Sequence, residues 1–299
     1  MTQTGYKSGF FSIVGCPNVG KSTLINRLVG QKIAIVTDRA QTTRNRITGV
    51  LTRRDYQMIF LDTPGMTKPR NKLGTFMQKT AEEASKDTEA ILLVIDALKG
   101  VGDRDADVIR IVKTYRAPVI VLINKCDAAS ALQMQEAREA VKDAGFDTVL
   151  AVSAKTGENV DKLEELLTGY LTEGPQYYPD DMVTDQPERV IVAEMIREKT
   201  LELLREEIPH GIGVGVDKMQ MRPEGNLMDV WATIYCERES HKGIIIGRGG
   251  KMLKRIGSEA RKDIEWLLDV QVNLQLWIKV KEDWRNRQQM LNELGYRDD

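Results

Sequence analysis

Eight residues near the start of the chain have the types and spacing of a phosphate-binding loop, G-x-x-x-x-G-K-S. Glycines let backbone N–H groups turn toward phosphate oxygens, the lysine adds a positive charge, and the serine hydroxyl is a ligand for Mg²⁺. The loop lies between an apolar stretch, 10–14, and a segment of helical character, 23–28, and this order favours phosphate binding over a chance glycine-rich turn. The candidate phosphate-binding residues are Gly15, Asn18, Val19, Gly20, Lys21, Ser22 and Thr23.

Two later stretches could complete a site for Mg²⁺ and the terminal phosphate. Residues 38–46 are polar without apolar periodicity and predict a mobile loop, in which Thr42 and Thr43 can each offer a hydroxyl to Mg²⁺. An apolar strand then ends at Asp62, whose carboxylate can hold the water shell of Mg²⁺. Gly65 has no side chain to keep its N–H away from a phosphate, so we interpret the turn as more than a plain β-turn.

Polar residues that could recognise a guanine base follow two further strands. Asp127 can accept hydrogen bonds from guanine N1–H and its 2-amino group, a donor pair that adenine lacks. Asn124 can bind the other edge of the base, and the stem of Lys125 can lie over the ring. After the next strand, backbone N–H groups can meet guanine O6; these residues are Ser153, Ala154 and Lys155.

The elements that position these residues form an α/β fold. Residues 90–96 and 118–123 are continuous apolar runs rich in branched side chains, which predict strands buried on both faces of a parallel sheet. Helical periodicity over 103–115 and 132–144 alternates with them. This alternation predicts a doubly wound, mostly parallel sheet of the P-loop NTPase type, with ligands at the carboxyl ends of the strands.

A break rich in proline, glycine and acidic residues divides the chain. It predicts a nucleotide-binding domain over 1–173, a linker over 174–182 and a smaller domain over 183–299. In the smaller domain we expect a long helix, two strands joined by a turn, a helical segment, a glycine-rich loop, a second helix and a last strand. The bounds expected for the regular elements are 187–207, 212–216, 228–236 and 272–280. We interpret Trp266 and Trp277 as core residues rather than surfaces for base stacking.

The glycine-rich loop of the smaller domain contains Ile-Ile-Gly-x-x-Gly and resembles the loop of the KH module, which clamps the backbone of single-stranded nucleic acid. Alone the motif is weak, because a helix cap would explain it as well, but the order of elements around it is that of a type II KH fold. Glycines permit close approach, cations meet phosphates, and the isoleucines can form a floor under the bases. The candidate RNA-binding residues are Ile245, Ile246, Gly247, Arg248, Gly249, Gly250 and Lys251.

Composition adds a charge asymmetry. The 299 residues are 41% hydrophobic and 29% charged with a net charge of −1, and three cysteines without ligand spacing predict a reduced, cytoplasmic protein. The segment from Ser240 to Lys281 contains nine basic and four acidic residues, so its net charge is +5 and the rest of the chain carries −6. This basic segment suggests a polyanion as partner, although a solvated basic face would look the same.

The nucleotide motifs resemble those of the translation-factor-related GTPases. Pro17-Asn18 in the phosphate loop and the stretch Ala40-Gln41-Thr42-Thr43-Arg44 are closer still to the Era family, as is the KH domain that follows. The resemblance implies a GTPase with GTP or GDP and Mg²⁺, whose metal ligands are Ser22, Thr43 and Asp62. It implies binding of single-stranded 16S ribosomal RNA near its 3′ end and assistance in assembly of the 30S subunit. Catalysis would rest on Asn18, Lys21, Thr43 and Gly65.

One departure from Ras-like proteins concerns the water-orienting glutamine, since Met66 stands in its place. The resemblance implies that K⁺ held by Asn18 can replace part of its role, with slow hydrolysis of about 10⁻⁴–10⁻² s⁻¹ without help. A scaffold that hardly hydrolyses GTP, and a membrane or cell-cycle regulator peripheral to the inner face of the cell membrane, stay open as alternatives. We expect a monomer.

Overall fold

The computed structural model describes residues 5–37, 42–65, 69, 71–204, 211–223 and 225–296. Contacts between Cα atoms divide the chain into two compact units, which are described separately here. The first unit comprises Met1–Ala34, Thr43–Lys68 and Met77–Asp185. The second comprises Ile35–Thr42, Pro69–Phe76 and Gln186–Asp299. The second unit therefore includes two segments from the first half of the chain, which the sequence did not predict.

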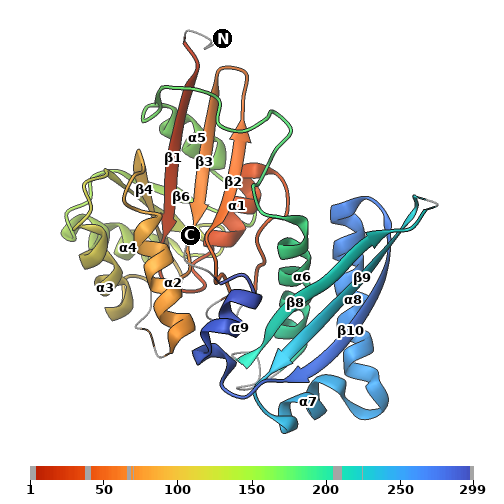
Figure 1. The fold of residues 1–299 in the computed structure, drawn as a ribbon. Helices are drawn as coiled ribbons and strands as arrows, with labels where there is room; N and C mark the ends of the chain where they lie inside the picture. Colours follow the sequence, from red (N-terminus) through yellow and green to blue (C-terminus); the bar gives the residue numbers. More distant parts are fainter. Residues whose placement is uncertain are drawn as a thin grey trace. The chain divides into compact units, whose positions relative to one another are not determined.

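The first unit is built on one sheet with the strand order β2-β3-β1-β4-β5-β6, and β7 pairs with the start of β1 (Figure 1). The pairs within β3-β1-β4-β5-β6 are parallel, whereas β2 and β7 are antiparallel to their partners. The predicted doubly wound, mostly parallel sheet is thus confirmed. The strands are β1 (Lys7–Val14), β2 (Ile47–Thr52), β3 (Tyr56–Asp62), β4 (Ala90–Asp96), β5 (Val119–Asn124), β6 (Val149–Val152) and β7 (Thr172–Glu173).

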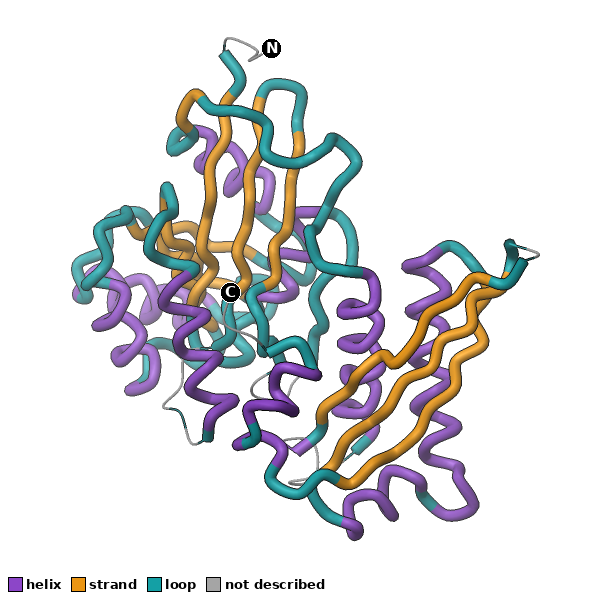
Figure 2. The backbone as a smooth tube through the Cα atoms, in the orientation of Figure 1, coloured by secondary structure: helices purple, strands orange, loops and turns teal. Residues whose placement is uncertain are grey.

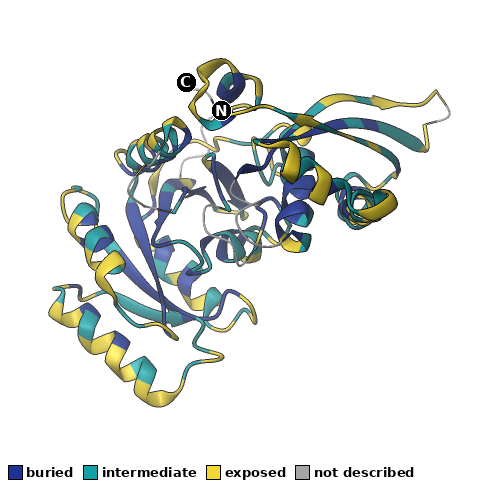
Figure 3. Cartoon of the chain, turned by 90° about the horizontal axis from the view of Figure 1, so that it is seen from below, coloured by how far each residue is buried: buried dark blue, intermediate teal, exposed yellow. Residues whose placement is uncertain are grey.

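Helices flank the sheet, so its central strands are buried on both faces (Figure 3). Every residue of β4 is buried, which explains why its sequence is a continuous apolar run instead of an alternating one. The helices carry apolar residues toward the sheet and charged residues toward solvent. They are α1 (Lys21–Val29), α3 (Asp103–Val112), α4 (Ala131–Asp143), α5 (Val160–Thr168) and α2 (Lys72–Glu83), whose first residues, up to Phe76, are assigned to the second unit.

The predicted linker is bound to the first unit along much of its length. The side chain of Gln57, which is fully buried, accepts hydrogen bonds from the backbone N–H groups of Tyr177 and Tyr178 at 2.9 and 3.0 Å. The ring of Tyr177 packs edge-on against Phe10, with ring centroids 5.0 Å apart. These contacts extend the first unit to Asp185, beyond the predicted end of the domain.

The second unit has a three-stranded sheet in the order β10-β9-β8, in which β9 and β10 are parallel and β8 is antiparallel to β9. Figure 2 shows the strands as one layer, with the long helices on one of its faces. This is the predicted α+β KH arrangement. The elements are α6 (Glu188–Leu203), β8 (Gly213–Met221), β9 (Leu227–Cys236), α7 (Glu239–Ile246), α8 (Lys251–Leu268), β10 (Gln271–Val280) and α9 (Gln288–Glu293), with short 3-10 turns at Arg248–Gly250 and Trp284–Asn286.

Two of the tryptophans contradict their predicted place in the core. Trp266 on α8 is 63% exposed and Trp277 on β10 is 45% exposed. Aliphatic residues fill the core of this unit instead, among them Ile196, Ile234 and Ile264. Trp277 alternates along β10 with the partly buried Leu276 and Ile278. Trp266 is two positions from the buried Ile264 on α8, so strand and helical periodicity could have indicated the exposure of both tryptophans.

Among the helices that the structure describes, none combines the length and the apolar character needed to span a bilayer.

Candidate functional site

The glycines of the phosphate loop are required by the space around them. Gly15 has φ +151°, and a Cβ there would lie 2.5 Å from the carbonyl oxygen of Val94. Gly20 has φ +102°, and its Cβ would lie 2.1 Å from the side-chain nitrogen of Asn124. Any larger residue would push the loop away from the sheet. Because Gly20 is the N-cap of α1, the unpaired N–H groups at the helix start are presented by this loop.

Lys21 places its ammonium group inside the loop. Its Nζ donates hydrogen bonds to the carbonyl oxygens of Gly15 at 3.1 Å and Cys16 at 3.0 Å. The side chain is buried, and burial lowers the pKa of Lys21, while the carboxylate of Asp62 acts in the opposite direction. A positive charge held at a helix start among inward N–H groups is suited to a polyphosphate.

Three residues predicted from separate segments bring their side-chain oxygens together. Ser22 Oγ lies 2.8 Å from Thr43 Oγ1 and donates to Asp62 Oδ2 at 2.9 Å. Thr43 Oγ1 lies 3.4 Å from the same carboxylate oxygen. Of the two threonines that the sequence left open, Thr43 is therefore the one that joins this cluster.

The cluster has the chemistry of a Mg²⁺ site. Hydroxyl and carboxylate oxygens are the ligands that this ion prefers in proteins. Asp62 is fully buried and its Oδ1 has no hydrogen-bond partner in the described part of the chain, so an acceptor position is left for a cation or its waters. Burial raises the pKa of Asp62 to about 6, although Lys21, Ser22 and Thr43 each favour its charged form. A divalent cation would favour the ionised carboxylate further.

Gly65 lies against the phosphate loop. A Cβ at this position would lie 3.0 to 3.2 Å from atoms of Pro17, which leaves little room for a side chain. Thr63, two residues before Gly65, donates its hydroxyl proton to the carbonyl oxygen of Ile13 at 2.9 Å, and this bond holds the turn at the end of β1. Met66 lies outside the described residues.

The residues predicted to recognise a base are joined to the phosphate loop by hydrogen bonds. The side chain of Asn124 donates to the carbonyl oxygen of Val19 at 2.8 Å and accepts from the N–H of Ala154 at 2.9 Å. Lys125 donates to the carbonyl oxygen of Asn18 at 3.0 Å. Asn124 and Lys125 thus hold the loops after β1, β5 and β6 at one edge of the sheet.

Two residues that support this edge were not predicted. Asp96, at the end of β4, forms an ion pair with Lys125 at 2.6 Å and is buried, so it orients the lysine. Arg27 on α1 donates to the carbonyl oxygens of Ala154 and Lys155. Asp96 could have been predicted from its position at the end of an apolar strand, whereas nothing in the local sequence indicates a role for Arg27.

Asp127 and the loop after β6 complete the set. The side chain of Asp127 is exposed just beyond the end of β5, where its carboxylate can reach a ligand. Ser153 is buried, and its Oγ accepts a hydrogen bond from the N–H of Thr156 at 3.0 Å, which shapes the turn. The structure therefore gathers the predicted base-side residues at the carboxyl ends of β5 and β6, where ligands of open α/β sheets bind.

In the second unit, the glycine loop joins α7 to α8. A Cβ on Gly247, which has φ +70°, would lie 2.6 Å from the Cβ of Met252, so the first glycine is needed for packing. Gly249 and Gly250 have positive φ, but a Cβ at either would meet nothing within 4 Å. Their smallness instead leaves space outside the loop, beside the exposed side chain of Arg248.

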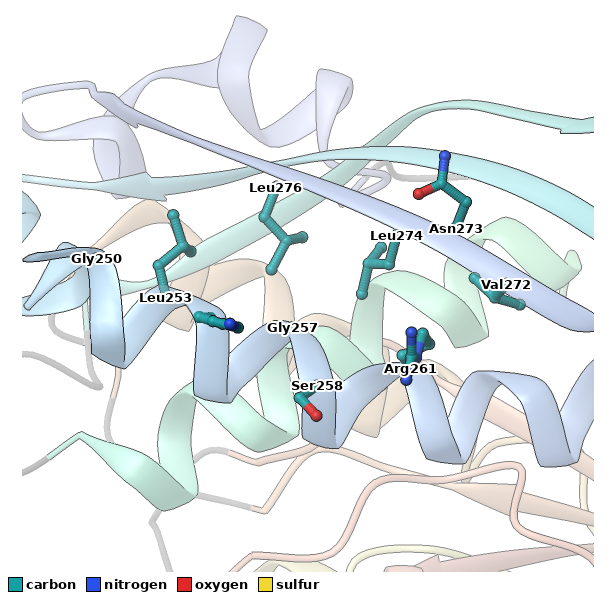
Figure 4. A pocket seen from close by; sticks show the side chains of 10 residues that line it. Gly250, Leu253, Gly257, Ser258, Arg261, Val272, Asn273, Leu274 and Leu276 are labelled. Carbon is teal, nitrogen blue, oxygen red and sulfur yellow. The ribbon is translucent and has the colours of Figure 1, made fainter.

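A groove of about 470 Å³ runs from this loop between α8 and β10 (Figure 4). Its apolar floor is formed by Leu253 from the helix and by Leu274 and Leu276 from the strand, while Lys254 and Arg261 add positive charge. An apolar floor beside cations and a glycine loop can hold bases while the backbone meets the cations.

The predicted role of Ile245 is wrong. Ile245 is completely buried in the core of the second unit and cannot form a floor under bases. Ile246 is partly exposed, but it is not among the residues that line the groove. The apolar floor comes from leucines of α8 and β10, which lie after the motif and so could not be identified from it.

The segment Ile35–Thr42 is assigned to the second unit, and two of its residues, Val36 and Thr42, form hydrogen bonds with α6. Glu198 Oε1 accepts a hydrogen bond from the N–H of Val36 at 2.8 Å. Arg197 donates to the carbonyl oxygen of Thr42 and also pairs with Glu194. Arg197 is fully buried; although burial disfavours its charge, the carboxylate of Glu194 raises the pKa of the guanidinium above its ordinary value.

This fold and these sites define a class: a P-loop guanine-nucleotide-binding protein that carries a C-terminal KH domain. Residues 10–125 match the family described as "50S ribosome-binding GTPase", and residues 207–285 match the family "KH domain". The chain is 52% identical to the GTPase Era of Clostridioides difficile (strain 630) over 297 residues, which covers 98% of this chain and 99% of that protein. It is 48% identical to the GTPase Era of Alkaliphilus metalliredigens (strain QYMF), with 97% and 99% covered.

Two solved structures are similar over nearly the whole chain. One is Era in complex with MgGDPNP and nucleotides 1506–1542 of 16S ribosomal RNA, at 38% identity and a TM-score of 0.93, covering 97% of this chain and 99% of that one. The other, with the same identity, TM-score and coverage, is a variant of Aquifex aeolicus Era bound to GDP·AlF4⁻. The chain belongs to the Era family of GTPases, as its motifs indicated, and is an enzyme that hydrolyses GTP.

Proposed function

We propose that this protein is a GTP-dependent switch that binds single-stranded ribosomal RNA near the 3′ end of 16S RNA and assists assembly of the 30S subunit. The observation that supports it most directly is the groove between α8 and β10, with an apolar floor, two lining cations and the glycine loop at one end. The similar Era structure that contains nucleotides 1506–1542 of 16S ribosomal RNA indicates which RNA to test.

In the first unit, we assign these roles to the residues of the site. Lys21 and the N–H groups of the phosphate loop bind the β and γ phosphates. Mg²⁺, held by Ser22, Thr43 and Asp62, neutralises charge on the phosphates when bound. Asp127 and Asn124 read the guanine base, and Gly65 donates its N–H to the γ phosphate. The reaction is slow because Met66 cannot orient water, and K⁺ at Asn18 offsets charge on the phosphates.

The switch depends on the segment Ile35–Thr42. This segment ends next to Thr43, whose hydroxyl lies in the Ser22–Asp62 cluster, and it is bound at both ends by Glu198 and Arg197 of α6. Since α6 also packs on α8, which lines the groove, a ligand that orders Thr43 can alter the groove through α6. The expected monomeric state, and the alternative of contact with the membrane surface, stay predictions.

Replacement of Gly249 by Asp tests the RNA-binding site. A Cβ at this position would meet nothing within 4 Å, and aspartate tolerates positive φ, so the fold should be retained, but a negative charge would face the RNA backbone. We expect the variant to bind GTP normally and to lose binding of a single-stranded RNA with the 3′-end sequence of 16S RNA. Full RNA binding by this variant would contradict the proposed function. Gly225→Asp, also at positive φ and with open space around it, is the matched control.

A further inference from the structure

The sheet of the second unit has a second face, opposite the helices. Side chains of β10 alternate: Leu274 and Leu276 point toward α8, whereas Asn273 lies on the other side of the strand (Figure 4). Trp277 shares the side of Asn273, and the strand register places Trp231 of β9 on it as well, opposite Gln275. We call the surface formed by these alternate residues of β9 and β10, together with the adjoining part of β8, the open face.

Described residues of the second unit itself cover one end of the open face. Leu294 and Trp284 lie within 3.4 Å of the positions that a Cβ on Gly213 or Gly215 would occupy, and Gly213 is paired with Tyr235. The register runs from there toward Trp231 and Trp277, where Trp277 keeps 45% of its surface exposed. Single exposed apolar side chains are common, but neighbouring ones that form a patch mark an interaction site.

The two tryptophans are spaced as neighbours on adjacent strands. Trp277 pairs in register with Thr233, two residues from Trp231, so the two indoles occupy diagonal positions. Such positions lie about 7–8 Å apart, within reach of aromatic side chains. Two flat aromatic surfaces on a rigid sheet at this separation can each stack one base of a single strand.

Charge on the open face suits a polyanion. Lys218 places its ammonium 5.3 Å from the ring centre of Trp231, and neither it nor the exposed Lys279 forms an ion pair with a carboxylate in the described part of the chain. Asp229 is held by Arg222 at 2.8 Å and by Asn273 at 2.7 Å, which together lower the pKa of Asp229 to about 2.

The remaining carboxylate of this part of the face, Asp217, accepts the hydroxyl proton of Thr233 at 2.8 Å. This part of the face therefore has three cations (Lys218, Arg222 and Lys279) and two carboxylates (Asp217 and Asp229). Arg222 is paired with Asp229, so Lys218 and Lys279 are the cations that can contact phosphates. The excess is small, so it directs a polyanion to the face without excluding uncharged contact by the indoles.

We propose that the open face is a second RNA contact, where bases of a single strand stack on Trp231 and Trp277. This inference rests on the proposed function, because the strand reaches the open face from the groove. Among the strands that the structure describes, β10 pairs with β9 alone, so it is an edge strand, and its alternate residues line both surfaces. An RNA that leaves the groove can pass around this edge without crossing another element of the second unit's sheet. Continuity with the groove and the excess of cations favour RNA over a protein as the occupant.

The test compares two RNAs on the full chain loaded with a non-hydrolysable GTP analogue. A short RNA of about six nucleotides fills the groove, since a KH loop clamps four nucleotides, and a longer one of about twelve extends it. We expect Trp277→Leu and Trp231→Leu each to weaken binding of the long RNA by about 5- to 150-fold, the usual effect of losing one stacked base. Binding of the short RNA should not change, which also shows that each variant is folded.

Trp266→Leu is the matched control, because Trp266 is more exposed than Trp277 but lies on α8, away from the open face. An unchanged affinity for the long RNA in both face variants would overturn the inference, as would an equal loss for both RNAs. Loss of small-subunit binding with intact RNA affinity would identify the face as a protein contact and overturn it too. Gly249→Asp separates the two claims: if it leaves the short RNA bound, the proposed function itself fails.

Discussion

The carboxylate of Asp127 is exposed at the end of β5, and its proposed partners on guanine are two N–H donors. Asp127→Asn replaces one acceptor by an amide donor, which suits the 2-oxygen of xanthine. In the variant, the amide N–H would face the 2-amino donor of guanine with no acceptor between them. A mismatch of hydrogen-bonding groups in a binding site can cost as much as about 10⁴-fold, so a large loss of GTP affinity and a gain for the xanthine nucleotide are expected. Nucleotide titration measures both.

Asp143→Asn, at an exposed position on α4, should leave GTP affinity unchanged. If Asp127→Asn also binds GTP as before, then Asp127 does not read the base, and the assignment of guanine specificity to it is wrong.

Asn18 has an unusual backbone conformation for a residue other than glycine, with φ +66°, and its carbonyl oxygen accepts from Lys125. If its side chain helps to hold K⁺ beside the phosphates, GTP hydrolysis should be faster in K⁺ than in Na⁺. A positive charge placed there acts in a site shielded from water, where loss of a single stabilising group costs about 10²–10³ in rate. Single-turnover phosphate release in the two salts measures the difference.

Asn18→Ala should abolish the preference for K⁺ and retain GDP binding. Equal rates in K⁺ and Na⁺ for the unchanged protein would refute the cation idea outright, whatever the variant does.

At the scale of elements, sequence patterns predicted strands whose two faces are both buried. β4 and β5 are long apolar runs, and the structure confirms them within a residue at each end. β2, which contains Gly49 and lies at the sheet edge, was not predicted, because its pattern is short and mixed. This segment is a strand because it pairs with β3, and such tertiary pairing is not visible in the local sequence.

The linker shows why composition alone was insufficient. Its prolines and glycine predict a break in regular structure, and this is what the structure has. They do not predict that Gln57, 120 positions earlier than Tyr177, binds the backbone of this segment. The sequence motifs likewise predicted the Ser22–Thr43–Asp62 cluster, whereas Arg27, Asp96 and Arg197 support the site through contacts between distant segments.

Helix α6 provides a prediction about coupling. Arg197→Lys keeps the buried charge near Glu194 but loses the planar fork that also reaches the carbonyl oxygen of Thr42. Coupled sites typically change each other's affinity by about 5- to 150-fold. If α6 couples the nucleotide site to the RNA site, RNA affinities of this variant in the GTP-analogue and GDP states should differ by about 2-fold or less. RNA titration in the two nucleotide states measures the ratio.

Arg189→Lys is the matched control, since Arg189 lies on the same helix with an exposed side chain. Thermal unfolding of both variants checks that the second unit stays folded. A full nucleotide effect in Arg197→Lys would show that α6 does not transmit the state of Thr43 through this arginine.

The whole molecule combines an enzyme that hydrolyses GTP with a KH domain whose groove we propose as the RNA-binding site. Each unit has its own core, so the two could act as independent modules. Ile35–Thr42 follows α1 and Pro69–Phe76 follows β3 in sequence, and both segments belong to the second unit.

The most direct test of this account is a titration of a short single-stranded RNA with the 3′-end sequence of 16S RNA against the full chain loaded with GDP or with a non-hydrolysable GTP analogue. If the two sites are coupled, RNA affinities should differ by about 5- to 150-fold between the two states. Because linkage is reciprocal, RNA must change the ratio of the two nucleotide affinities by the same factor. Identical RNA affinities in both states would show that the nucleotide does not control RNA binding and would leave two uncoupled modules on one chain.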